Sequence, residues 1–424
     1  MSEEKEEKKE VSAIKGTKDI LPKEVGQWQK VEATARRAFE LYGYREIRTP
    51  IIEPTELFEK GTGETSDIVI KEMYTFVDKA GRSNTLRPEY TPSVVRAIIE
   101  NRLYLLPEPL RFYYWGPMFR YDKPQKGRYR QFHQIDIEVF GEKDPAIDAE
   151  IVEMADFLLR ELNVTETEIL VNSVGCKECR PSYMKELRAQ AEKVKESLCP
   201  DCQRKVITNP LRIFDCKIET CKEKAATFPK TLDFLCQECK EHFTQFCGYL
   251  DLYKIKYKIE PRLVRGIDYY TKTTFEIVSS KLGAQSSVLG GGRYDDMMKV
   301  FGGPDLCGIG FAMGMERLIE VANLSTEKPK FLYITYLGED AKKVGIGLAR
   351  YFRKNGIESL IEFKDKSLKN QMSRANKLKA SWVLIIGEEE VKKGRYQLKE
   401  MATGLQKEGT REETLKILLE NRSL

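Results

Sequence analysis

A hairpin rich in arginine and lysine, residues 119–134, carries side chains suited to chemistry on an anion. Apolar residues on both sides follow strand-like patterns, and Pro124 and Gly127 interrupt them, so the segment predicts two strands joined by a loop. Arg120 and Arg130 then stand near the strand ends, where fixed guanidinium groups suit a polyphosphate. A solvated basic hairpin explains the same pattern equally well.

A second candidate is the carboxylate of Glu89 in the segment T-L-R-P-E-Y-T-P. Because Pro88 restricts the local backbone, Glu89 and Thr91 should be extended, with their side chains fixed. A carboxylate presented in this way can hold an ammonium group. From the residues alone, an ion pair at the protein surface is the favoured interpretation.

Nine of the ten cysteines lie within residues 176–247. They comprise the pairs Cys176/Cys179, Cys199/Cys202 and Cys236/Cys239, and the single residues Cys216, Cys221 and Cys247. In an intracellular protein such C-x-x-C pairs favour zinc over disulfides, because two pairs of thiolates complete a tetrahedral site. The set predicted to bind zinc is Cys176, Cys179, Cys199 and Cys202, and Cys236/Cys239 could replace either pair. Reduced cysteines packed as small hydrophobic residues are the alternative.

Hydrophobic periodicity predicts the elements that hold these residues. The spacing indicates helices over residues 25–42 and 147–162, and a strand over residues 71–78. A strand followed by Gly290–Gly292 ends either in a plain turn or at a place where a ligand approaches the backbone. After a linker at residues 328–330, alternating strands and helices predict a compact α/β domain that ends in a helix.

The composition is that of a soluble globular protein with a heavily charged surface. The 424 residues suffice for two or three domains, and 41% of them are hydrophobic and 32% charged. No apolar run approaches the length of a membrane span, and no signal-like hydrophobic region is present, so we expect a cytoplasmic protein. Residues 1–12 are expected to be a disordered, charged tail.

Three stretches, in this order, resemble those of one enzyme family. The hairpin at residues 119–134 resembles motif 2 of class II aminoacyl-tRNA synthetases. L-V-R-G-I-D-Y-Y at residues 263–270 resembles the signature of the histidyl-tRNA synthetases, and G-I-G-F-A-M-G-M-E-R-L at residues 308–318 resembles class II motif 3. The resemblance extends over nearly the whole chain.

The resemblance implies an α+β fold with a class II catalytic domain built on an antiparallel sheet. This domain would comprise residues 13–174 and 258–325, interrupted by a mostly α, cysteine-rich insertion at residues 175–257. Residues 328–424 resemble the anticodon-binding α/β domain. Tyr44–Pro54 resembles motif 1, which forms the dimer interface in this class, so a homodimer is expected; an ordinary edge strand is the alternative.

The reaction implied by the resemblance has two steps. The carboxylate of L-histidine attacks the α-phosphate of ATP to give histidyl-adenylate and diphosphate, and the 3′-terminal ribose of tRNA(His) then accepts the histidyl group. Because the first nucleophile is already an anion, the site must neutralise and position charge. The resemblance implies that Arg120 binds the α-phosphate, Arg317 the γ-phosphate, and Arg265 the reacting phosphorus opposite Arg120, with Mg²⁺ bridging phosphate oxygens.

The resemblance also implies how each substrate is recognised. Asp122, where the family usually has Glu, would face the adenine amino group, and Phe132 would stack on the adenine. Glu138 and Tyr270 would recognise the imidazole. The residues implied for histidine binding are Glu89, Tyr90, Thr91, Gln134, Glu138, Arg265, Tyr269, Tyr270 and Tyr294. Tyr90 and Pro92 replace the Gly and Ala that are usual in the family.

Two regions are expected to contact tRNA. Lys126 and Arg128, at the tip of the hairpin, should meet the acceptor end. Residues 328–424 contain 21 Lys and Arg against 13 Asp and Glu, whereas the whole chain has a net charge of only +5. A basic C-terminal domain suggests a polyanion partner, here the anticodon end.

Two other functions fit parts of the sequence. The regulatory subunit of ATP phosphoribosyltransferase is a synthetase-like protein without aminoacylation, and Tyr90 and Pro92 resemble it slightly. It typically lacks the basic C-terminal domain and an intact R-G-I-D-Y-Y, and this chain has both. A zinc-stabilised RNA-binding protein without catalysis would not need Arg120, Arg265 and Arg317 together.

Overall fold

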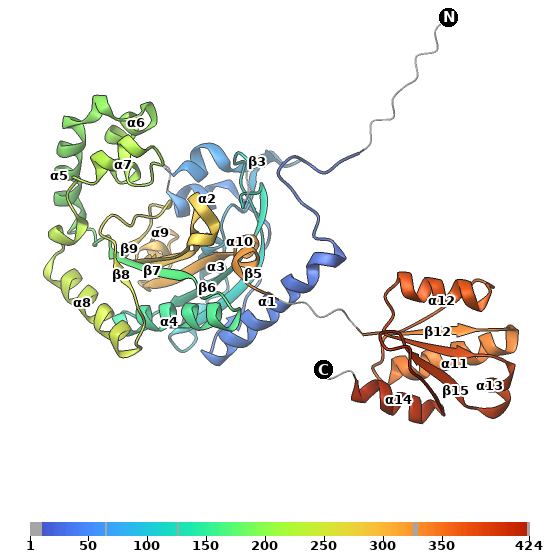
Figure 1. Ribbon diagram of the computed structural model, residues 1–424. Helices are drawn as coiled ribbons and strands as arrows, with labels where there is room; N and C mark the ends of the chain where they lie inside the picture. Colours follow the sequence, from blue (N-terminus) through green and yellow to red (C-terminus); the bar gives the residue numbers. More distant parts are fainter. Residues whose placement is uncertain (1–10, 64–65, 125–126, 325–329, 422–424) are drawn as a thin grey trace, which may run out of the picture. The chain divides into compact units, whose positions relative to one another are not determined.

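The computed structural model describes residues 11–63, 66–124, 127–324 and 330–421, and it divides into two compact units between Thr326 and Glu327 (Figure 1). Each unit has its own sheet and its own hydrophobic core. Within the described ranges, none of the helices is long and apolar enough to cross a membrane.

Unit 1 is built on an eight-stranded sheet with the strand order β1-β5-β6-β11-β10-β9-β7-β8. Neighbouring strands are antiparallel, except for the parallel pairs β1/β5 and β7/β8 at the two edges. The predicted antiparallel sheet is thus confirmed. The strands are β1 (Arg45–Glu46), β5 (Leu110–Phe119), β6 (Gln131–Phe140), β7 (Thr167–Ser173), β8 (Lys258–Ile259), β9 (Thr271–Ser279), β10 (Ser287–Arg293) and β11 (Gly308–Gly314).

Helices α1 and α4, with α8 from the insertion, pack against this sheet and form its main core. The spacing of Trp28, Val31, Ala35 and Phe39 predicted α1, and all four are buried. Helix α4 starts where Asp144 accepts a hydrogen bond from the Ala146 N–H at 2.8 Å, which caps its first turn. The helices are α1 (Pro22–Leu41), α2 (Thr55–Thr62), α3 (Thr91–Glu100), α4 (Pro145–Glu161), α9 (Met297–Val300) and α10 (Met315–Val321), with short helical turns at Leu103–Leu105 and Ser280–Gln285.

Strands β5 and β6 form the hairpin that the sequence predicts. Their antiparallel ladder runs from the Leu110/Phe140 pair to the Phe119/Gln131 pair. One residue further, the Arg120 N–H donates to the Arg130 carbonyl at 2.9 Å. The sheet therefore holds the backbone of Arg120 directly at the end of a strand.

A smaller sheet, with the order β2-β4-β3, precedes the hairpin in the chain. Its strands are β2 (Ile52–Pro54), β3 (Tyr74–Val77) and β4 (Ser83–Leu86). The strand predicted over residues 71–78 is therefore too long at its start, because Ile68–Glu72 forms a π-helical turn. This turn brings the side chain of Glu72 to the cavity described below.

The insertion is mostly helical, as predicted (Figure 1). Residues of its first three helices form a separate small core that includes Tyr183, Leu187 and Val206. The helices are α5 (Arg180–Lys193), α6 (Pro200–Thr208), α7 (Glu219–Ala225) and α8 (Gln237–Leu252), with short turns at Lys195–Ser197, Pro210–Ile213 and Thr231–Phe234.

Unit 2 is an α/β domain with the strand order β13-β12-β14-β15-β16. Strand β12 is parallel to β13 and β14, and the remaining pairs are antiparallel. The predicted alternation of strands and helices is confirmed, and the sequence analysis missed only the short α13 and β16. The elements are β12 (Leu332–Tyr336), α11 (Glu339–Lys354), β13 (Ser359–Ile361), α12 (Leu368–Lys377), β14 (Trp382–Ile386), α13 (Glu388–Lys393), β15 (Tyr396–Glu400), β16 (Gln406–Gly409) and α14 (Arg411–Glu420).

Candidate active site

A cavity of about 580 Å³ lies in unit 1. Strands β6, β9, β10 and β11 contribute to its lining, together with residues 89–91, the base of the hairpin loop and the loop at residues 264–270. Four side chains between residues 205 and 217 of the insertion complete it. Segments distant in the sequence thus converge on one concave site of the size expected for a small-molecule ligand.

Arg120 and Arg317, two arginines selected from the sequence, line this cavity and are held by backbone carbonyl groups. Nε of Arg120 donates to the Pro88 carbonyl at 2.8 Å, and its guanidinium lies 5.2 Å from the centre of the Phe132 ring. Arg317, in the first turn of α10, donates from Nε to Gly127 at 3.3 Å and from a terminal nitrogen to Ser287 at 3.1 Å. These bonds to neutral carbonyls orient the guanidinium groups without removing their charge.

The arginines of the cavity are close enough to repel one another. The pKa of Arg317 is lowered, first by burial and then by the positive charges of Arg128, Arg265 and Arg120. Like charges that gather in a partly buried cavity are a feature of functional sites. The arrangement therefore suits a ligand with several negative charges, such as a polyphosphate.

Arg265 lies against a strand that has no side chain at the point of contact. A Cβ atom on Gly290 of β10 would lie 2.2 Å from the guanidinium carbon of Arg265. One terminal nitrogen of Arg265 donates to Glu276 of β9 at 2.5 Å, while its buried Nε has no partner among the described residues. The sequence suggested a turn or a ligand contact at Gly290–Gly292. Instead, these glycines lie inside β10, and the group that approaches the backbone at Gly290 is the chain's own arginine.

A second group of cavity residues is centred on the buried carboxylate of Glu138 in β6. Its Oε1 accepts hydrogen bonds from the Thr91 hydroxyl at 2.6 Å and the Tyr114 hydroxyl at 2.7 Å. Its Oε2 has no partner in the part of the chain that the structure describes, and Gly310 leaves space for it, since a Cβ there would lie 2.1 Å away. Burial raises the pKa of Glu138 to about 8. When this carboxyl group ionises, its Oε2 is an acceptor that suits a ligand N–H group.

Glu89 is buried, with 4% of its surface exposed, so the favoured interpretation of a surface ion pair was wrong. Its carboxylate accepts hydrogen bonds from Thr62 and, at 3.2 Å, from Tyr269. Burial raises the pKa of Glu89. The ring centre of Tyr269 lies 4.9 Å from that of Tyr270 and 5.5 Å from that of Tyr294, and all three tyrosines line the cavity.

Gln134, Phe132 and Thr91 also line the cavity. The buried Oε1 of Gln134 lacks a hydrogen-bond partner within the described ranges, so it too is available to a ligand. Tyr90 is 2% exposed, and its ring stacks on Tyr114 with 3.7 Å between centres. The larger side chain at position 90 is therefore accommodated mainly by the core beside the cavity.

Asp122 and Arg128 form an ion pair at 2.7 Å across the hairpin loop, and both line the cavity. The other oxygen of Asp122 accepts the Lys123 N–H at 2.7 Å. A contact from Asp122 to an adenine amino group would therefore compete with Arg128. Lys126, the second residue expected to meet tRNA, lies outside the described residues.

The raised pKa of Glu138 gives the ligand-free protein a pH-dependent stability. The folded state binds this proton more tightly than the unfolded state, whose carboxyl group has an ordinary pKa near 4.5, so stability is lost as the pH rises towards 8. Glu138 should contribute a loss of about 2 kcal/mol between about pH 5.5 and about pH 7.5. Glu138→Gln, which keeps an acceptor for Thr91 and Tyr114, should remove this part of the slope. Urea unfolding at both pH values measures it, and an unchanged slope would contradict the prediction.

Two family models match the chain in succession. Residues 16–318 match the model "Histidyl-tRNA synthetase", and residues 332–421 match the model "Anticodon binding domain". The histidine–tRNA ligase of Halothermothrix orenii is 48% identical over 404 residues, which cover 94% of this chain and 96% of the relative. That of Trichlorobacter lovleyi is 48% identical, with 93% and 95% covered.

The chain belongs to the histidyl-tRNA synthetase family.

A solved member of the family has the same fold. The crystal structure of apo histidyl-tRNA synthetase from S. aureus superposes with a TM-score of 0.81 at 34% identity, covering 96% of this chain and all of that one. The predicted fold and the predicted enzyme class, an aminoacyl-tRNA ligase, are confirmed by these relationships. The two alternative functions lose their support accordingly.

Several cavity residues of this family member escaped the sequence analysis. Arg212 and Asp215 of the insertion line the cavity together with Lys205 and Lys217. Arg212, Asp215 and Lys217 lie in L-R-I-F-D-C-K, residues 211–217, and Lys205 precedes this segment. The sequence analysis considered only the cysteines of this region, as possible metal ligands. The charged residues of that segment were the one available sign of a ligand contact. No pattern in the neighbouring sequence indicates that the segment packs next to the catalytic sheet.

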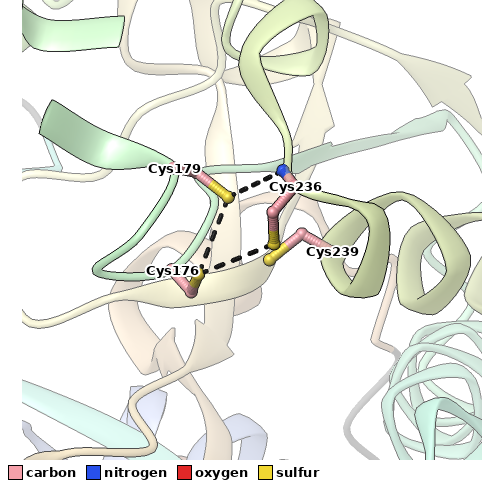
Figure 2. A group of neighbouring side chains, drawn as sticks. All are labelled: Cys176, Cys179, Cys236 and Cys239. Carbon is pink, nitrogen blue, oxygen red and sulfur yellow. Dashed lines mark hydrogen bonds between the residues drawn. The ribbon is translucent and has the colours of Figure 1, made fainter. Parts of the chain in front are cut away.

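The preferred set of Cys176, Cys179, Cys199 and Cys202 does not lie together, whereas the alternative in which Cys236/Cys239 replace Cys199/Cys202 matches one of two groups of four cysteines. Cys176/Cys179 lie together with Cys236/Cys239, as Figure 2 shows, whereas Cys199/Cys202 lie together with Cys216 and Cys221. The first grouping arises because the start of α5 meets the start of α8. In each group the four sulfur atoms lie within 4.8 Å of one another. Cys247 belongs to neither group.

Proposed function

We propose that this chain activates L-histidine with ATP and transfers the histidyl group to the 3′ end of tRNA(His). In the first step, a carboxylate oxygen of histidine bonds to the α-phosphorus, and the bond from that phosphorus to diphosphate breaks. In the second, the 3′-terminal ribose oxygen bonds to the histidyl carbonyl carbon, the hydroxyl proton is released, and AMP leaves. The observation that carries the proposal is the meeting of three arginines with a buried carboxylate network in one cavity.

The arginines would supply the charge compensation that phosphoryl chemistry needs. Arg120 would bind the α-phosphate, Arg317 the γ-phosphate, and Arg265 would face the reacting phosphorus from the side opposite Arg120. Because the three groups are already fixed by carbonyls and by Glu276, little reorganisation is needed during the reaction. Phe132 would stack on the adenine, and Asp122 would bind its amino group if the pair with Arg128 opens.

Histidine would be recognised by the acidic part of the cavity. Glu138 presents an oxygen without a partner among the described residues to an imidazole N–H, and Tyr270 would contact the same ring. Glu89, Thr91 and Gln134 would hold the amino end, while the walls would come from Tyr90, Tyr269 and Tyr294. A site with buried polar groups that need ligand partners rejects amino acids that cannot supply them.

Magnesium would enter with ATP. Among the described residues, the groups of three or more possible metal ligands consist only of cysteines, so the cavity holds no ready-made carboxylate cage. Mg²⁺ commonly keeps water ligands and binds through one or two carboxylates plus substrate phosphates. Glu72 and Glu276, which line the cavity near Arg120 and Arg265 respectively, fit that role. When bound, the ion would neutralise phosphate charge.

An exchange assay tests the proposal directly. The protein should incorporate labelled diphosphate into ATP only when L-histidine is present, because the first step is reversible. Omitting histidine, or replacing it with an isosteric amino acid that lacks the imidazole nitrogens, is the control. Absence of histidine-dependent exchange in protein that binds both substrates would refute the activation step.

The charge distribution supports two separate tRNA contacts. We propose that residues 13–174 and 258–325 hold the acceptor end and carry out the chemistry, and that the basic residues 328–424 bind the anticodon end. The hairpin tip with Lys126 would meet the acceptor end. Arg128 would do so as well, although its place beside Arg317 means that it would also affect ATP. The cytoplasm, where tRNA is used in translation, is the proposed location.

Deleting residues 328–424 should weaken tRNA binding and reduce its dependence on salt, because fewer phosphates are neutralised. Unit 1 has its own core, so histidine-dependent exchange should survive in a truncated protein that ends at residue 327. Filter binding at several salt concentrations gives the slope. If the affinity for tRNA and its salt dependence are unchanged, the main RNA contact must lie elsewhere, and the insertion at residues 175–257 becomes the candidate.

We also propose a homodimer through Tyr44–Pro54. Ile51 and Ile52 of this segment are 39% and 52% exposed, so apolar surface is available for a partner. Sedimentation velocity at micromolar concentration should show a species of twice the chain mass of 49.0 kDa. Ile52→Lys should shift it towards the single chain, whereas a single-chain species for the unmodified protein would contradict the proposal.

A further inference from the structure

The two cysteine groups of the insertion have the geometry of metal sites. The sulfur atoms of Cys176 and Cys179 lie 3.6 Å apart, those of Cys176 and Cys236 3.9 Å (Figure 2), and those of Cys199 and Cys216 4.0 Å. Four thiolates bound to one Zn²⁺ at about 2.3 Å in a tetrahedron are about 3.8 Å apart. A disulfide would require about 2.05 Å, and all these cysteines are free.

Backbone N–H groups surround the sulfur atoms. The Cys236 N–H donates to the sulfur of Cys179 at 3.1 Å, and the Cys199 N–H donates to that of Cys221 at 3.3 Å. The Cys202 N–H donates to the sulfur of Cys199 at 3.4 Å. Such donors stabilise the thiolate form, which is the form that binds a metal.

The ion best suited to these groups is zinc. Thiolates select soft or borderline metals, and four in a tetrahedron favour Zn²⁺ or iron–sulfur centres. Because all four sulfur atoms of a group lie within 4.8 Å of one another, each group has space for one ion but not for a cluster of several irons. Within the described chain, neither group contributes a side chain to the catalytic cavity, so a structural role follows.

The first group is linked to one end of the signature loop, residues 264–270. Cys179 is followed by Arg180, which opens α5 and donates to the carbonyl of Tyr270 at 2.5 Å. Cys236 and Cys239 fix the start of α8 to the same point. A metal ion here would hold Arg180 against Tyr270.

The second group is linked to the beginning of the same loop. Cys202 and Cys216 enclose a segment in which Asn209 donates to Asp268 at 3.1 Å, and Arg212 donates to the Gly266 carbonyl at 2.5 Å. Arg212 also lines the cavity. A metal ion that joins Cys202 to Cys216 would fix both ends of this segment and thereby keep Arg212 beside Gly266.

We propose that the insertion binds two Zn²⁺ ions, one in each four-cysteine group, and that together they position the signature loop from its two ends through Arg180 and Arg212. Both arginines are positioning residues, because Arg212 contacts the carbonyl of Gly266, directly after Arg265, and Arg180 contacts the carbonyl of Tyr270, directly after Tyr269. The ions act at a distance from the reaction and take no part in its chemistry. The kinetic consequence rests on the proposed function, whereas the metal content does not.

Metal analysis of the full chain tests the sites. The purified protein should contain about two zinc ions per chain, and Cys236→Ser and Cys216→Ser should each lose about one. Cys247→Ser is the matched control, since Cys247 lies in the insertion outside both groups, and it should keep two. A mercurial reagent with a zinc-binding dye counts the ions released even from a variant that folds poorly. Metal-poor protein with all cysteines reactive, after growth and refolding with Zn²⁺, would overturn the proposal.

Hydrogen exchange measured by mass spectrometry tests the positioning. Removing zinc with a chelator should accelerate amide exchange at residues 264–270 and raise the KM for histidine about tenfold, and adding Zn²⁺ should restore both. Arg212→Met should also raise the KM for histidine, although the protein retains both ions, and this result would separate the positioning role from folding. Arg212→Lys should give a KM between those of Arg212→Met and the unmodified protein. Unchanged exchange at residues 264–270 after complete zinc removal would overturn the positioning role. Loss of activity with normal exchange and metal content would count instead against the proposed function.

Discussion

Replacing Arg265 with lysine should lower kcat for histidine-dependent ATP–diphosphate exchange about a hundredfold, which corresponds to roughly 3 kcal/mol. The KM for histidine should change much less. Lysine retains the positive charge but loses the planar, two-pronged hydrogen bonding of the guanidinium group. An interaction formed mainly in the transition state appears in kcat when it is removed.

The structure strengthens this expectation because the space around Arg265 is shaped for a flat group. Gly290 leaves the backbone of β10 uncovered beneath the guanidinium, and Glu276 fixes one of its edges. A lysine ammonium would still reach Glu276, but it would not fill the same plane. The buried Nε, which has no partner within the described chain, is lost altogether.

Arg262→Lys is the matched control. Arg262 precedes Arg265 by three residues and donates to the Ala226 carbonyl at 2.7 Å, outside the cavity lining. Its replacement should leave kcat within about twofold. If Arg265→Lys instead changes only the KM, Arg265 binds substrate without assisting the reaction. Gly290→Ala, which would displace the guanidinium, should resemble Arg265→Lys.

Replacing Arg293 with methionine should destabilise unit 1 by about 3–5 kcal/mol, since it leaves a buried carboxylate without its partner. Arg293 is 1% exposed and donates through Nε to both oxygens of Asp148, at 2.9 and 3.0 Å. It also donates to the Glu142 carbonyl at 2.9 Å. This pair joins β10 to α4 inside the protein. Arg293→Met/Asp148→Leu should regain part of the loss because both charges are then absent.

The measurement must separate the two units, because each has its own hydrophobic core and a chain of two domains need not unfold in a single two-state transition. In a Trp382→Phe background, the remaining tryptophans, Trp28 and Trp115, both report on unit 1. Arg160→Met is the control on α4, the helix that carries Asp148, because Arg160 pairs with Asp156 at 2.8 Å and its side chain is 68% exposed. It should cost no more than about 1 kcal/mol. Similar losses for the two variants would show that burial of the pair is unimportant.

The sequence predicted those features that depend on neighbouring residues. The alternation in β5 and β6 and the breakers between them located the hairpin and placed Arg120 at a strand end. The spacing in α1 located the buried face of that helix. Arg265 and Arg317 were singled out by the resemblance to the family motifs rather than by periodicity, and both line one cavity.

Features that depend on packing between distant segments could not be predicted. The sequence shows that Cys176 and Cys179 form a pair, but only the meeting of α5 with α8 decides which pair joins them. Glu89 appeared to be a surface residue because Thr62 and Tyr269, which enclose it, come from other parts of the chain. Likewise, no local pattern connects Arg265 with Gly290.

The repulsion among the cavity arginines implies a trade-off between stability and activity. The pKa of Arg317 is lowered first by burial and then by the positive charges of Arg128, Arg265 and Arg120, so the ligand-free fold carries a repulsion that a bound polyanion would relieve. Part of the apparent affinity for ATP then comes from the relief of this repulsion, and inorganic anions should compete with ATP for the same arginines. A neutral residue at position 120, where Nε of the arginine binds the Pro88 carbonyl rather than a carboxylate, would make the empty protein more resistant to heat and a poorer catalyst. Selection for thermal stability alone would therefore tend to remove the charges on which substrate binding depends.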